Sequence, residues 1–77
     1  MNHLEAKQEE NELVKLLSTK YPDLIAHIDI FEATDEIVIS FFWNRITIEK
    51  WNDATSFKCH NKDYQKVLKT EIIPYFI

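Results

Sequence analysis

The sequence contains no glycine, although average usage of roughly 7% would place about five glycines in a chain of 77 residues. Glycine takes up left-handed backbone conformations without a side-chain clash and lets the main chain approach a phosphate closely. Its absence excludes the P-loop, the dinucleotide-binding fingerprint and the nucleophile elbow, each of which is built on glycines. Composition alone therefore rules out three common classes of catalytic or nucleotide-binding site.

Cysteine and long apolar runs are also scarce. Cys59 is the only cysteine, so no disulfide forms within the chain, and a small domain without disulfides is typical of a reducing compartment. No apolar run approaches the ~18 residues that span a bilayer, and the first residues lack the basic and apolar pattern of a signal peptide. We expect a cytoplasmic protein that makes no membrane contact.

The residues that are present favour a small, densely packed domain. Hydrophobic residues make up 45% of the chain and aromatic residues 13%. A chain of 77 residues predicts a single domain over residues 1–77. Because a domain of this size buries only ~60% of its unfolded surface, its core must be small and densely apolar. A drug-sized cleft of ~300 Å³ would remove packing that such a domain needs, so size favours a binding module over an enzyme.

The net charge of -4 is unevenly distributed. Up to residue 36 there are nine acidic residues against three lysines, whereas the remainder carries a small excess of positive charge. A molecule with two such halves offers surfaces of opposite sign to its partners. Ordinary solvated charge is the simpler interpretation, and both remain open.

The first 20 residues are strong helix formers without proline, and their apolar residues recur at helical spacing. They predict an amphipathic helix from Asn2 to about Lys20, which Pro22 ends by disfavouring helical geometry at the preceding residue. Glutamates in its first turns and lysines near its end complement the helix dipole.

Alternating apolar residues then predict strands over 24–31 and 37–43, joined by a turn over 32–36. Asn44 and Arg45 predict a two-residue hairpin, because asparagine tolerates the positive φ that such a turn requires. A third strand is expected over 46–51, then a turn over 52–54 and a short fourth strand over 55–59.

Asn61 is the predicted N-cap of a closing helix, which Pro74 limits and which packs through Tyr64, Val67 and Ile72. The predicted fold class is α+β. It comprises an N-terminal helix, an antiparallel meander of three or four strands and a C-terminal helix, with both helices on one face of the sheet.

The strand alternation leaves large apolar side chains on the other face of the sheet. If the helices cover Ile28, Ile37 and Phe41, the opposite face carries aromatic rings among polar neighbours, namely Phe31, Phe42 and Trp51. Aromatic anchors within a polar rim are typical of protein interfaces. A partner protein, a second copy in a homodimer or the chain's own C-terminal tail could cover these rings.

Two charged patterns provide further candidate binding residues. Glu5, Glu9 and Glu12 share one face of the first helix and could imitate phosphate in a basic groove, although helix-dipole stabilisation explains them as well. Lys62, Lys66 and Lys69 fall at i, i+4 and i+7 of the closing helix. Such a stripe would contact nucleic acid, while simple solvation is the commoner role of exposed lysines.

No motif predicts a metal, a cofactor or a catalytic group. Cys59 and His60 are adjacent, but neighbours on a strand point to opposite faces, and no C-x-x-C pair accompanies them. His27 and Asp29 resemble an acid and base pair without an evident nucleophile or pocket. We therefore expect no metal, no cofactor and no enzymatic activity.

The sequence leads to a non-catalytic protein that binds and blocks another macromolecule, with a nucleic-acid-handling protein as the favoured target. Size, acidity and architecture of this kind are shared by phage-encoded inhibitors of bacterial defence, such as anti-CRISPR proteins, and by immunity proteins and antitoxins. This analogy is one of class and transfers no residue. The alternative is a small nucleic-acid-binding regulator that uses the lysine stripe.

Overall fold

The structure, a computed structural model, describes the backbone of residues 1–45 and 51–77 and the side chains of residues 1–44 and 53–77. Helix α1 (His3–Leu17) begins at a reciprocal cap between Asn2 and Glu5. The Asn2 side chain accepts the Glu5 N–H, and the Glu5 carboxylate accepts the Asn2 N–H. The helix ends at Leu17, a few residues before the predicted end.

Within the described residues, three strands form an antiparallel sheet in the order β1-β2-β3. They are β1 (Ile25–Phe31), β2 (Glu36–Arg45) and β3 (Trp51–His60). Residues 32–35 form the first turn, in which Asp35 has a φ of 55°. Aspartate visits this left-handed region more readily than most residues, so the turn forms without a glycine.

Strand β2 extends further along the chain than the sequence predicted. Asn44 and Arg45 belong to β2, and Arg45 pairs with Trp51. Asn44 has the expected positive φ, 58°, but the strand continues through it, because pairing with β3 satisfies more main-chain groups than a turn there would. The predicted turn over 52–54 and the separate strand over 55–59 are also wrong, since both segments lie in β3. The predicted strand over 46–51 lies outside the described residues, apart from Trp51.

The C-terminal segment is helical but changes its winding. It comprises the 3₁₀ turn η1 (Asn61–Asp63), the helix α2 (Tyr64–Val67), the π turn η2 (Leu68–Ile72) and the helix α3 (Ile73–Phe76). Pro74 does not limit the helix as predicted. Proline has no N–H to donate to the preceding turn, which widens so that the Ile73 N–H reaches the Leu68 carbonyl.

The predicted cap at Asn61 is wrong as well. No side chain caps η1. Instead, the Asn61 side-chain amide donates from its nitrogen to the Met1 carbonyl and accepts at its oxygen from the Met1 amino group. The preceding residue, His60, takes the extended N-cap position. Asn61 therefore joins the start of the chain to the start of the C-terminal segment.

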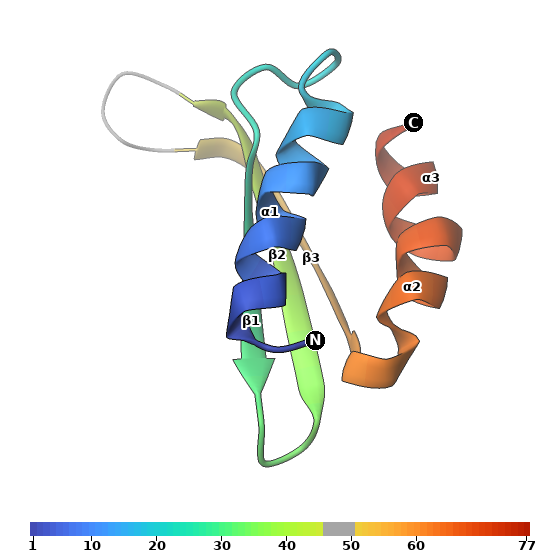
Figure 1. The fold of residues 1–77 in the computed structure, drawn as a ribbon. Helices are drawn as coiled ribbons and strands as arrows, with labels where there is room; N and C mark the ends of the chain where they lie inside the picture. The colour runs from blue at the N-terminus through green and yellow to red at the C-terminus, as the bar shows by residue number, and fades with distance from the viewer. Residues whose placement is uncertain (46–50) are drawn as a thin grey trace.

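The α+β architecture has two layers, as predicted. Helix α1 and the C-terminal helical segment lie side by side on the same face of the sheet (Figure 1). The core between the layers contains Leu13 and Leu17 from α1, the inward residues of the sheet and the inward residues of the C-terminal segment, among them Ile37, Ile39, Phe41, Tyr64, Ile72 and Phe76. Within residues 1–45 and 51–77, no helix covers the opposite face of the sheet.

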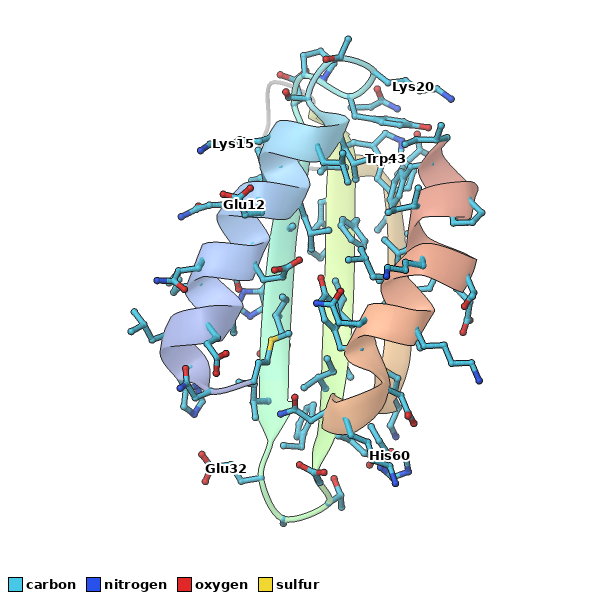
Figure 2. All side chains as sticks on the ribbon, turned by 45° about the vertical axis from the view of Figure 1, so that its right-hand side comes forward. Glu12, Lys15, Lys20, Glu32, Trp43 and His60 are labelled. Carbon is cyan, nitrogen blue, oxygen red and sulfur yellow. The ribbon has the colours of Figure 1, made fainter. Side chains whose placement is uncertain are left out.

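An aromatic cluster fixes the end of the chain to this core. Phe76 is fully buried and packs edge-to-face on Phe41 and Tyr21, with ring centroids 4.8 and 5.3 Å away. Trp43 of β2 joins the same cluster, with its ring centroid 5.4 Å from that of Phe76. Figure 2 shows Trp43 between the two helical segments. The C-terminal residues therefore pack on the helix side of the sheet and do not cover the other side.

Candidate protein interface on the open sheet face

The open sheet face is defined here by the outward residues of the three strands, which the pairing register arranges in four rows. They are Ile25, Phe42 and Ala54; His27, Ser40 and Ser56; Asp29, Val38 and Lys58; and Phe31, Glu36 and His60. The burial of the alternate residues confirms the predicted assignment of β1 and β2 residues to this face. The buried residues on the other side are Ala26, Ile28, Ile37, Ile39 and Phe41.

Large apolar side chains lie at both ends of the open sheet face. Phe31 is 50% exposed at the end that holds Glu36 and His60. Ile25 is 45% exposed at the other end, in the same row as the half-buried Phe42. Beside Phe42, a shallow hollow of about 290 Å³ is bordered by Ser40, Ala54, Thr55 and Ser56. An apolar group of a partner could enter this hollow.

The middle of the face is polar. The His27 Nε2 atom lies 3.0 Å from Asp29 Oδ1, and the Lys58 ammonium lies 3.6 Å from the Glu36 carboxylate. These polar contacts, of which the Lys58–Glu36 pair is an ion pair with an exposed ammonium, contribute little to folding stability. They give the surface the mixture of apolar anchors and polar groups that protein interfaces use.

Trp51 was predicted to be the third aromatic residue of this surface. Its backbone begins β3 opposite Arg45. The Trp51 side chain lies outside the described residues, so its contribution to binding stays a prediction. The same holds for the residues predicted at positions 46–50.

The structure divides the three acidic candidates of α1. Glu5 is exposed and completes the helix cap, while Glu12 is exposed and lies 3.9 Å from the Lys15 ammonium. Figure 2 shows Glu12 and Lys15 on the side of α1 away from the sheet. Glu9 instead faces the C-terminal segment, where its carboxylate accepts the Tyr64 hydroxyl at 2.8 Å. One of the three carboxylates is thus engaged inside the fold, which weakens the case for phosphate imitation.

The lysine candidates are all exposed, but they border different hollows. Lys62 lies in η1 and borders the hollow that Glu5 and Glu9 line beside α1. Lys66 lies in α2 and borders the hollow next to β3, which also contains Asp63 and Glu71. Lys69 lies in the π turn. Changes of winding and nearby carboxylates therefore interrupt the predicted basic stripe.

Cys59 faces the helices on the side opposite to His27 and is half-buried. Burial raises the pKa of its thiol above the ordinary value of 9.0, and the nearby Asp63 and Glu71 carboxylates raise it further. The thiol is therefore the dominant form at neutral pH, which disfavours a role as a nucleophile.

Burial of Tyr64 and its hydrogen bond to Glu9 raise the pKa of its hydroxyl far above the ordinary value of 10.0. This side chain is a structural link between α2 and α1. Among the described residues, no group of three or more His, Cys, Asp or Glu side chains is arranged to hold a metal ion. In the same residues, no helix has the length and hydropathy required to cross a membrane.

Sequence reasoning placed Phe31, Phe42 and their polar neighbours on β1 and β2 on this surface, but it missed six other residues, namely Ile25, Glu36, Ala54, Ser56, Lys58 and His60. Ile25 carried a detectable signal, because it alternates in phase with Phe31. Ala54 and Lys58 were missed because the hairpin was predicted too early, which hid their pairing with β2. Comparison with family models, with curated proteins and with solved structures found no match.

Proposed function

We propose that this chain is a non-catalytic protein that binds another protein through its open sheet face and thereby blocks it. The observation that carries the proposal is the one-sided covering of the sheet. Both helical segments and the C-terminal aromatic cluster pack on one side, while Ile25 and Phe31 on the other side stay about half exposed. Exposed apolar residues that share a surface with polar groups are characteristic of interaction sites.

The class of target follows from size and charge. A domain of 77 residues with a net charge of -4 is too small for a deep cleft and is repelled from nucleic acid at long range. It is attracted to basic proteins, and many nucleic-acid-handling proteins are basic. We therefore propose such a protein as the target, in an anti-CRISPR-like, immunity-like or antitoxin-like role in the bacterial cytoplasm.

Capture of the tagged chain from a host lysate, with and without nuclease, tests this proposal directly. A protein that is retained in both conditions identifies the target, and its affinity for the purified chain is then measured by calorimetry. Retention that disappears with nuclease contradicts the proposal and supports the nucleic-acid alternative, in which reversal of Lys62, Lys66 and Lys69 to glutamate abolishes binding.

Two matched variants place the interface. Phe31→Ala weakens binding by about 2 kcal/mol, roughly 30-fold in Kd, if Phe31 is an anchor of the interface. Leu16→Ala is the control, because Leu16 is 51% exposed on α1 in the other layer of the molecule. Equal affinities of the two variants and the unmodified chain would exclude the open sheet face as the interface.

A further inference from the structure

The two edges of the sheet differ in their main-chain hydrogen bonding. At the β1 edge, the Ile28 N–H points away from β2 and donates to the Glu10 carboxylate at 2.8 Å. Glu10 comes from α1, and only 12% of its side chain is exposed. The helix thus occupies an outward donor of β1 and shields this edge from another strand.

The direction of the Ile28 N–H also fixes which groups are outward at the β3 edge. In an antiparallel sheet, the N–H and C=O of one residue point to the same side, and this side alternates along the strand. Ile28 pairs with Ile39, so Ile39 bonds to β3 through its partner Phe57. The main-chain groups of Phe57 therefore point toward β2. Because the direction alternates along the strand, those of Ala54, Ser56 and Lys58 point away from the sheet.

These outward groups lack a partner within the part of the chain that the structure describes. There, no hydrogen bond joins the outward main-chain groups of Ala54, Ser56 or Lys58 to another element. Ser56 and Lys58 are exposed. A strand with this pattern is complementary to a second strand, which would satisfy every outward group.

We propose that the β3 edge binds the β3 edge of a second copy of this chain, forming an antiparallel two-fold dimer with a continuous sheet. Placing the axis at Ser56 pairs Ser56 with Ser56 of the second copy and Ala54 with Lys58. Such an interface is isologous, so one set of residues satisfies both copies. No two like charges lie directly opposite each other among these three positions, and the small Ala54 faces the long Lys58.

Two further features fit a second copy. A two-fold axis perpendicular to the sheet keeps Thr55 and Phe57 on the helix-covered side in both copies, so each face of the sheet stays continuous across the junction. Lysine on an edge strand commonly prevents pairing, but the Lys58 ammonium lies 3.6 Å from its own Glu36 on the open face. This pairing directs its charge away from the edge. The dimer would also place two open sheet faces side by side.

The test compares Ser56→Pro and Ser56→Lys with the unmodified chain by light scattering and hydrogen exchange. Proline removes one outward N–H, which an edge strand tolerates, whereas the Ser56→Lys substitution sets two positive charges against each other on the axis. The unmodified chain is expected at twice its monomer mass of 9.2 kDa, and both variants at the monomer mass. Thr34→Lys, which adds the same charge in the first turn, is expected to remain dimeric.

Hydrogen exchange assigns the surface. The Ser56 and Lys58 amides are expected to be protected at high concentration and to exchange faster on dilution. A monomeric unmodified chain at the highest attainable concentration overturns the proposal, as does a dimer in which these two amides exchange rapidly. If Ser56→Pro does not fold, Ser56→Lys decides, because it keeps the main-chain donor. Neither result bears on binding through the open sheet face, which a monomer can also perform.

Discussion

Phe41 and Phe42 are neighbours on β2, yet they belong to two faces of the sheet with different roles. Phe41 is fully buried, and its ring packs against Phe57 and Phe76 at centroid distances of 6.0 and 4.8 Å. Phe42 is half-buried and borders the shallow hollow of the open face. The helix-covered face therefore holds the buried core, while the open face keeps apolar residues that the helices do not cover.

The largest difference between the faces is expected for phenylalanine truncation. Phe41→Ala removes a fully buried ring and should lower the free energy of unfolding by about 3–5 kcal/mol. Phe31→Ala, on the open face, should change it by less than about 0.5 kcal/mol. Urea denaturation followed by far-UV circular dichroism measures both values.

Should Phe41→Ala be unfolded in water, Phe41→Leu gives a milder measure of the same site. A loss of stability in Phe31→Ala as large as that in the Phe41 variants would contradict the division between the faces. It would show instead that Phe31 is part of the core.

The two edges of the sheet provide a smaller contrast. Glu10→Ala leaves the Ile28 N–H without its charged acceptor and should lower the free energy of unfolding by about 1.5–3 kcal/mol. Glu10→Gln should cost less, because its amide oxygen can still accept this bond. Glu12→Ala is the matched control on the same helix, since Glu12 is 67% exposed, and should lie within about 0.5 kcal/mol of the unmodified chain.

Thermal and urea denaturation of these three variants decide the role of Glu10. Equal stabilities of Glu10→Ala and Glu12→Ala would contradict the idea that α1 shields the β1 edge. Concentration-dependent aggregation of Glu10→Ala alone would support it, because the variant exposes an outward donor.

The sequence predicted the faces of the sheet more accurately than its turns. Alternation over 24–31 and 37–43 is a local signal, and burial confirms it at Ile28, Ile37 and Ile39. The turn predicted at Asn44 also rested on a local signal, the tolerance of asparagine for a positive φ. Pairing of β2 with β3, between residues further apart in the chain, overrode that signal. The prediction that Pro74 limits the closing helix also rested on a local signal, the missing proline N–H. It is wrong because the π turn before Pro74 accommodates the proline and the helix continues to Phe76.

The contacts that connect elements could not be predicted from sequence. Glu9 and Glu10 are adjacent glutamates on an acidic helix, and nothing local distinguishes them from Glu5 or Glu12. Their roles arise because α1 lies between β1 and the C-terminal segment, where Glu9 meets Tyr64 and Glu10 meets Ile28. Such contacts depend on tertiary packing and require the structure.

Tyr64 is expected to make stability depend on alkaline pH. Its hydroxyl pKa is raised in the folded state by burial and by the hydrogen bond to Glu9. The unfolded chain therefore loses this proton first, and the free energy of unfolding falls as pH rises above the ordinary value of 10.0. Tyr64→Phe should cost about 1 kcal/mol at neutral pH and flatten this fall.

Urea denaturation between neutral and strongly alkaline pH measures the effect, in a Cys59→Ser background that removes the second group with a raised pKa. Identical pH profiles with and without the Tyr64→Phe substitution would contradict the raised pKa. Tyr75→Phe in the same background is the control, because Tyr75 is 54% exposed, and it should retain the profile of the Cys59→Ser chain.

Reactivity of Cys59 gives the smallest and most local comparison between the covered and open sides. Burial and the Asp63 and Glu71 carboxylates raise the pKa of the thiol, so the reactive thiolate is scarce at mildly alkaline pH. Iodoacetamide should alkylate the folded chain several-fold more slowly than the urea-unfolded chain. Glu71→Gln should increase the folded rate by removing a neighbouring negative charge, whereas Glu32→Gln, in the exposed first turn, should not. If the folded and unfolded chains were alkylated at equal rates, the Cys59 thiol would be open to solvent in the folded chain. The helices would then shield the β3 side of the covered face less than the packing implies.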